Sequence, residues 1–112
     1  MIKPKKICEE IIMLILKCDL EILRELNCNR LAKMYGLHRS TLSKIFKECR
    51  GIYFGESIKL IKLLRCAFLM AEERDLTVKK ISVIFGFKSA DYFIKSFKKM
   101  FGMTPGEFRR LN

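Results

Sequence analysis

The stretch LNCNRLAKMYGL, residues 26–37, is repeated later in the chain as LTVKKISVIFGF, residues 76–87. The two copies match without a gap in their apolar positions, and each ends in a glycine followed by an apolar residue. Asn27 and Thr77 supply the side-chain oxygen that a helix N-cap needs. A glycine at the end of a helix allows the left-handed conformation of a sharp turn. Each copy therefore predicts a capped helix followed by a turn.

The similarity continues beyond the glycines after one extra residue in the second copy. The matching residues are Leu42, Lys44, Phe46, Lys47 and Gly51 in the first copy and Phe93, Lys95, Phe97, Lys98 and Gly102 in the second. The small residues Ala32 and Ser82 permit two helices to approach closely. We interpret the repeat as two helix-turn-helix units. A plain helical bundle with chance similarity is the alternative.

Apolar spacing predicts an all-α fold, because residues recur with the helical period and no segment alternates with a period of two. We predict seven helices, over about 4–18, 28–35, 40–50, 55–73, 78–85 and 89–101 and in a short segment from Pro105. Leu20, Ile22 and Leu23 either extend the first helix or form an irregular link. The helix over 55–73 is apolar on several faces, which predicts a central element packed on both sides.

We predict one DNA-binding domain over residues 1–112, with two subdomains joined by a long linker helix. The first helix-turn-helix subdomain covers 1–52, the linker helix 53–75 and the second subdomain 76–112. The roughly nineteen helical residues expected over 55–73 would span a little less than 30 Å. It could set two DNA-reading helices roughly one duplex turn apart, about 34 Å. We therefore predict a single chain that reads an asymmetric site.

The second helix of the first unit has two distinct faces. Leu42, Ile45 and Phe46 form an apolar stripe that anchors the helix to a core. The opposite stripe is hydrophilic and basic, contains no acid, and consists of Ser40, Ser43, Lys44 and Lys47. Short polar side chains and lysines suit the major groove, where they reach base acceptors or phosphates. A merely solvated face is the alternative, although such faces usually carry glutamates too.

The second helix of the second unit shows the same division. Its inward stripe consists of Phe93, Phe97, Met100 and Phe101. Its outward stripe consists of Ala90, Asp91, Ile94, Lys95 and Lys98. Ala90 and Ile94 could touch thymine methyl groups. Asp91 either accepts from a cytosine amino group or caps the helix start, and we favour capping.

The net charge of the chain indicates which class of molecule it binds. Lys and Arg number 23 against 12 acids, which gives a formal net charge of +11. A domain this basic favours a polyanion, either a nucleic acid or an anionic membrane surface. The longest apolar run, residues 11–16, is too short to span a bilayer. Two glutamates and the lack of a cleavage site argue against a signal peptide.

The residues offer little for cofactors or catalysis. The five cysteines are scattered: Cys8, Cys18, Cys28, Cys49 and Cys66. We expect reduced, mostly buried thiols in a cytosolic protein, with no metal site and no cofactor. His38 is the one histidine, and the sequence shows neither a conspicuous carboxylate pair nor a phosphate-cradling glycine loop. We therefore predict that the protein is not an enzyme.

The chain resembles the AraC/XylS family of bacterial transcription regulators from about residue 7 to 110. The second unit carries the more specific elements, namely Tyr92-Phe93, Phe97-Lys98, Gly102-Met103-Thr104-Pro105 and Phe108-Arg109-Arg110. The resemblance implies two helix-turn-helix subdomains, a linker helix, and control of transcription, usually activation through contact with RNA polymerase. Most members carry a further sensing or dimerisation domain, so the chain is either a stand-alone regulator or a piece of a longer one.

The resemblance also implies site residues. By position, the base-contacting sites are Ser40, Ser43, Lys44, Ala90, Asp91 and Lys95, to which the outward stripe adds Ile94. We predict that the following flanking residues contact phosphates: Arg39, Lys47, Thr77, Lys88, Lys98 and Lys99. The sequence departs from the family at four positions. His38 and Lys88 stand where a serine cap is common, Leu63 replaces a linker arginine, and Ile94 replaces a small polar residue.

The predicted function is a sequence-specific regulator that binds double-stranded DNA, activates transcription and works as a monomer in the bacterial cytoplasm. The alternative is a nonspecific, nucleoid-associated DNA binder or a membrane-surface binder that acts by charge alone. Such a protein would lose affinity for every sequence alike as salt rises.

Overall fold

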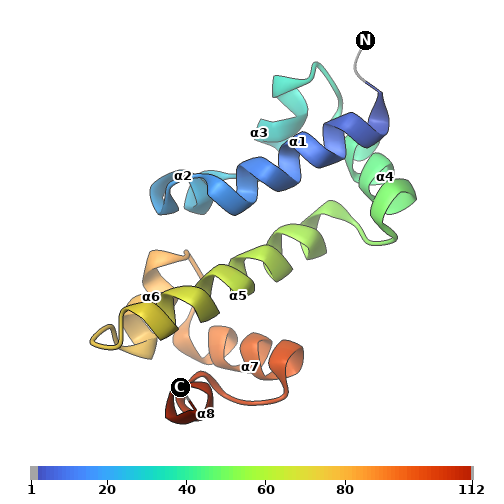
Figure 1. Ribbon diagram of the computed structural model, residues 1–112. Helices are drawn as coiled ribbons and strands as arrows, with labels where there is room; N and C mark the ends of the chain where they lie inside the picture. The colour runs from blue at the N-terminus through green and yellow to red at the C-terminus, as the bar shows by residue number, and fades with distance from the viewer. Residues whose placement is uncertain (1–2, 112) are drawn as a thin grey trace. The chain divides into compact units, whose positions relative to one another are not determined.

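The computed structural model describes residues 3–111, and helices are the only regular secondary structure in this part of the chain (Figure 1). Its eight helices are α1 (Pro4–Lys17), α2 (Leu20–Glu25), α3 (Cys28–Met34), α4 (Arg39–Arg50), α5 (Phe54–Glu72), α6 (Val78–Ile84), α7 (Ala90–Phe101) and α8 (Pro105–Leu111). The all-α prediction is confirmed. The described residues hold one helix more than predicted, and the other boundaries agree to within a residue or two.

The additional helix is α2, in the segment predicted to extend the first helix or to form an irregular link. Cys18 and Asp19 both adopt extended backbone angles, which ends α1 and starts a new helix. The amide of Leu23 donates to the Asp19 carbonyl at 2.9 Å, and the Leu23 side chain is fully buried. Burial of this one leucine fixes a segment too short to be a stable helix by itself.

The chain divides into two compact units, one up to Ile61 and the other from Lys62. In the first unit, α4 packs against both α1 and α3. The buried apolar side chains come from all the helices of the unit: Ile7, Cys8, Ile11, Ile15, Leu23, Leu31, Ala32, Leu42, Phe46, Phe54 and Ile61. Phe46 and Phe54 meet edge to face with centroids 5.2 Å apart. The inward stripe of α4 is thus anchored as the sequence predicted.

In the second unit, α7 packs against α6 and α8. Aromatic rings dominate its core: Phe97 lies 5.8 Å from Phe93, 4.5 Å from Phe101 and 5.7 Å from Phe108, measured between ring centroids. Arg109 on α8 donates to the carbonyl of Glu73 just beyond α5 at 3.0 Å. The aromatic contacts of Phe97 anchor the apolar side of α7 in this core.

A capping box starts α8. The amide of Thr104 donates to Glu107 at 3.0 Å, and the amide of Glu107 donates to the Thr104 hydroxyl at 3.1 Å. The pKa of the Glu107 carboxyl is lowered, chiefly because it accepts the backbone hydrogen bond from Thr104.

Helix α5 has an exposed apolar stripe beside its buried residues. Leu63, Cys66 and Met70 are buried, but Leu60, Leu64 and Phe68 are exposed, Phe68 by 70%. The exposed residues follow one another every fourth position and therefore share one side of the helix. The stripe is exposed although α5 has buried residues on two sides, Ile61 on one and Leu63 and Met70 on the other. Within residues 3–111, no helix is long and apolar enough to cross a membrane.

Candidate nucleic-acid interface

The two repeats share two equivalent backbone hydrogen bonds in their turns. In the first, the amides of Gly36 and Leu37 donate to the carbonyls of Lys33 and Ala32 at 3.1 and 2.9 Å. In the second, the amides of Gly86 and Phe87 donate to Val83 and Ser82, both at 3.0 Å. The glycines have φ of 66° and 74°, which L side chains rarely adopt.

The small residues lie where the sequence predicted close helix contact. Ala32 is 1% exposed and Ser82 is 2% exposed. The Ser82 hydroxyl donates to the Lys79 carbonyl at 2.7 Å, so its polar group is satisfied inside its own helix. These features support a helix-turn-helix geometry in each unit.

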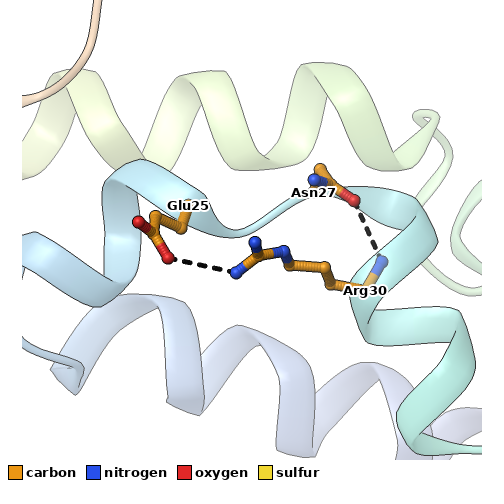
Figure 2. A network of polar contacts seen from close by, with 3 residues as sticks. All are labelled: Glu25, Asn27 and Arg30. Atoms are coloured by element: carbon orange, nitrogen blue, oxygen red, sulfur yellow. Dashed lines mark hydrogen bonds and ion pairs between the residues drawn. The ribbon is translucent and has the colours of Figure 1, made fainter.

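The predicted N-caps are confirmed at the start of both α3 and α6. The side chain of Asn27 accepts from the Arg30 amide at 2.9 Å, and the Thr77 hydroxyl accepts from the Lys80 amide at 3.1 Å. Figure 2 shows that the Arg30 guanidinium also reaches back to Glu25, with 3.1 Å between Nη1 and Oε2. This exposed ion pair ties the end of α2 to the start of α3.

Helix α4 begins at His38, which takes the position of a serine cap. Its Nδ1 accepts from the Ser40 amide at 3.2 Å and lies 2.8 Å from the Ser40 hydroxyl. The cap residue of α4 is therefore a histidine, and the Ser40 hydroxyl lies close to the same ring nitrogen.

The outward stripe of α4 faces solvent. Arg39, Ser40, Lys44 and Lys47 are exposed, and Ser43 is half-buried. A hollow of about 550 Å³ in the first unit adjoins them. Its lining includes Arg39, Ser40, Ser43 and Lys44 from α4, Asn27 and Cys28 from the start of α3, and Tyr53 and Gly55 beyond α4. The structure thus brings together the four polar side chains that the sequence singled out at the start of α4.

Lys47, nearer the other end of α4, does not line this hollow but contacts Tyr53, which does. Its ammonium donates to the carbonyl of Gly51 at 2.9 Å and lies 5.1 Å from the centroid of the Tyr53 ring. In the free protein this cation therefore stabilises the carboxyl end of its own helix. Sequence reasoning did not single out Tyr53, although an aromatic residue shortly after a lysine-bearing helix is a signal that could have been used.

Helix α7 is capped by Ser89, whose hydroxyl accepts from the Tyr92 amide at 3.0 Å. This corrects the expectation that Lys88 stands at the cap position. Lys88 is instead in the turn that holds the repeat's extra residue. The side-chain cap is also not Asp91, which we had favoured for that role. Asp91 is exposed in the first turn, where its negative charge interacts favourably with the positive end of the helix dipole.

The outward stripe of α7 is more apolar than that of α4. Lys95, Lys98 and Lys99 are exposed, whereas Ala90 and Ile94 are half-buried. The ammonium of Lys88 lies 4.9 Å from the centroid of the Tyr92 ring, so each unit has a lysine against a tyrosine. Thr77 is exposed at the start of α6.

The five thiols are free, and their burial differs from the expectation. Cys8 and Cys66 are buried, Cys18 and Cys28 are half-buried, and Cys49 is exposed. Burial raises the pKa of the Cys8, Cys28 and Cys66 thiols. Among residues 3–111, no group of three or more His, Cys, Asp or Glu side chains could hold a metal ion.

Comparison with known proteins identifies the fold and the family. A family described as "Helix-turn-helix domain" matches residues 31–111. A probable transcription factor of Proteus vulgaris, PqrA, is 34% identical over 79 residues, which are 70% of this chain and 64% of that protein. Alignments with two further regulators cover 29% and 30% of their lengths, so the chain spans less than two thirds of these relatives.

Two solved structures have the same fold. The C-terminal domain of AraT, a response regulator from Geobacillus stearothermophilus, has a TM-score of 0.80 at 24% identity, covering 95% of this chain and 85% of that one. The DNA-binding domain of AdpA, solved in complex with a target DNA, has a TM-score of 0.76 at 20% identity, covering 94% and 90%. With the sequence matches and the paired turns described above, these likenesses lead to one assignment: the chain belongs to the AraC-type family of helix-turn-helix DNA-binding domains.

Proposed function

We propose that this protein is a sequence-specific, double-stranded DNA-binding transcription regulator that activates its targets, with α4 and α7 as its reading helices. One observation carries the proposal. The same helix of each repeat is anchored by a buried apolar face and turns an acid-poor, lysine-bearing face to solvent. An anchored helix with such a face can enter the major groove with little repulsion between carboxylates and phosphates.

In the first unit, Ser40, Ser43 and Lys44 contact base edges. The hydroxyls are short enough to sit close to the groove floor, and the lysine reaches guanine acceptors. Arg39 and Lys47 contact the phosphates on either side. For Lys47, binding exchanges the Gly51 carbonyl for a phosphate oxygen, which is a stronger, charge-assisted partner.

In the second unit, Ala90, Asp91, Ile94 and Lys95 face the bases. Ala90 and Ile94 offer apolar contact to thymine methyl groups, and Asp91 accepts from a cytosine amino group. The phosphate contacts come from Thr77, Lys88, Lys98 and Lys99. The Thr77 hydroxyl uses a lone pair for its cap, so its hydrogen is available to a phosphate oxygen.

Both units work on one duplex and in one chain. Helix α5 belongs to each of them, and its 19 residues would span about 28 Å. We infer that the two reading helices enter successive major-groove segments of a site that need not be palindromic. A monomer of this chain then suffices for binding, in the bacterial cytoplasm where the DNA is. The similarity to a probable transcription factor and to a DNA-binding domain solved in complex with its target DNA supports this proposal.

Selection of bound duplexes from a random pool tests it. The expected result is one asymmetric motif with two blocks, each lost when its reading helix is altered. Equal binding to all duplexes, with the same steep fall in affinity as salt rises, would instead support a nonspecific, nucleoid-associated binder, which the net charge of +11 favours.

Activation and contact with RNA polymerase form a separate part of the proposal. In a purified transcription system with the selected site upstream of a promoter, the protein should raise transcript yield. A fall in yield at saturating protein would mean repression and would leave DNA binding untouched.

A further inference from the structure

We propose that Cys8 and Cys49 form an oxidisable thiol pair, which a low-molecular-weight disulfide converts into an intramolecular disulfide between α1 and α4. The inference concerns only the first unit and does not depend on DNA binding. It would make this unit responsive to the thiol–disulfide balance around it. Disulfides in reducing compartments are usually transient and serve redox sensing.

Helix geometry brings the two cysteines together. Cys8 is 1% exposed, and its Sγ donates to the carbonyl oxygen of Ile45 on α4 at 3.9 Å. In an α-helix this carbonyl also accepts the amide of Cys49, four residues on. The Cys8 sulfur therefore lies within about 7 Å of the Cys49 nitrogen. Cys49 also shares a face with Ile45, because residues four apart lie one turn above each other.

Cys49 also influences the ionisation of Cys8. The pKa of Cys8 is raised to about 12, first by burial, then by a side-chain hydrogen bond with Cys49 and by the charge that Cys49 would carry. This agrees with the proximity to α4 that the contact of Cys8 with the Ile45 carbonyl establishes. The remaining step to a disulfide is an approach of the two sulfurs to about 2.05 Å, which side-chain rotation and a small helix shift can supply.

The pair is asymmetric, which sets the order of the reaction. Cys49 is exposed and meets the reagent first, whereas Cys8 is buried. The Cys49 thiolate attacks one sulfur of the reagent disulfide, forms a mixed disulfide and expels one reagent thiolate. The Cys8 sulfur then attacks Cys49 Sγ and expels the second. Both protein thiols give up their protons to the two expelled thiolates, so two protein thiols are oxidised and one reagent disulfide is reduced to two thiols.

The bond would leave the outward stripe of α4 free. At 100° per residue, Cys49 lies close to Leu42 around the helix and about opposite Ser40. The disulfide would therefore tie α1 to the inner side of α4 without covering the side chains proposed to read DNA. Its effect is a covalent constraint on the helix that carries them.

Oxidation with glutathione disulfide, followed by alkylation and peptide mapping, tests the pair. We expect an intramolecular link between the Cys8 and Cys49 peptides, a mass lower by two hydrogen atoms, and full reversal by a thiol reductant. The melting temperature of the oxidised protein should rise by on the order of 10 °C, because the bond closes a long loop in the unfolded chain.

Matched variants make the assignment specific. Cys49→Ser, at an exposed position, should fold and lose both the link and the rise in melting temperature. Cys28→Ser should retain them, since the Cys28 thiol donates instead to the Arg39 carbonyl at 3.4 Å. A wild-type protein that yields only glutathionylated Cys49, a dimer, or a link between other cysteines would overturn the proposal. Failure to bind DNA would not affect this result.

Discussion

The lysines at matching positions of the two reading helices, Lys44 and Lys95, give the sharpest test of the DNA interface. Both are exposed, and among residues 3–111 no carboxylate pairs with either one. Replacing either lysine with alanine should therefore leave the folding free energy within about 0.5 kcal/mol of the wild type. Any large loss of binding can then be attributed to the contact with DNA.

The size of the loss distinguishes two kinds of contact. A lysine that donates to a guanine acceptor should contribute about 1 kcal/mol or more, or about fivefold in affinity, and its loss should relax preference at one base pair. A lysine that contacts phosphate should weaken all sequences alike and lower the slope of log affinity against log salt by about 0.9. We expect the first pattern at Lys44 and Lys95 and the second at Lys98.

Fluorescence anisotropy at several salt concentrations measures both quantities on the selected duplex and on single-base variants of it. Lys17→Ala is the matched control, because it removes the same charge from an exposed position at the end of α1. If Lys17→Ala weakens binding as much as Lys44→Ala and Lys95→Ala do, and base preference never changes, the assignment of reading helices is refuted.

Three further predictions concern the framework of these helices. Asn27→Ala removes the acceptor for the Arg30 amide and should lower the free energy of unfolding by about 1 kcal/mol in urea titrations; an unchanged midpoint would contradict the cap. Ala32→Leu forces a larger side chain into a position that is 1% exposed, so thermal melts should report a loss of about 1–3 kcal/mol. The lowered pKa of Glu107 means that its capping contribution is present above the ordinary value of 4.5 and is lost as pH falls through the folded value. Melts at about pH 7 and about pH 3 should therefore show a smaller acid-induced fall for Glu107→Gln than for the wild type, and equal falls would count against the capping box.

The helix-turn-helix units could be predicted from the sequence because their determinants are local. An N-cap, a small residue and a glycine at fixed offsets each act within one or two turns of helix. Asn27 and Thr77 therefore formed the expected caps, and Gly36 and Gly86 the expected turns. The inward aromatic residues of α7 followed directly from helical periodicity.

Short segments were harder, because competing local signals are nearly balanced there. The residues of α2 are helical only because Leu23 finds a buried position, which is a tertiary contact. At the start of α7, Lys88, Ser89 and Asp91 all lie within a residue or two of the cap, and only the backbone angles select Ser89. Alignment of the repeats with a one-residue insertion could have pointed to Ser89, since His38 occupies the corresponding position.

Contacts between helices far apart in the sequence could not be predicted from it. The contact of Cys8 with the Ile45 carbonyl on α4 depends on how α1 packs on α4, and the spacing of the cysteines does not predict it. The exposure of Phe68 is likewise invisible in an apolar sequence pattern. The engagement of Lys47 with Gly51 and Tyr53 depends on the path of the chain after α4.

The histidine cap of α4 determines which hydrogen-bonding role Ser40 can offer to DNA. In the His38 tautomer whose Nδ1 accepts from the Ser40 amide, the hydroxyl 2.8 Å away directs its own hydrogen toward the same nitrogen. The Ser40 oxygen is left with lone pairs for the groove. Its matching partners are the exocyclic amino groups of adenine and cytosine, so the base pair opposite Ser40 should present one of these donors.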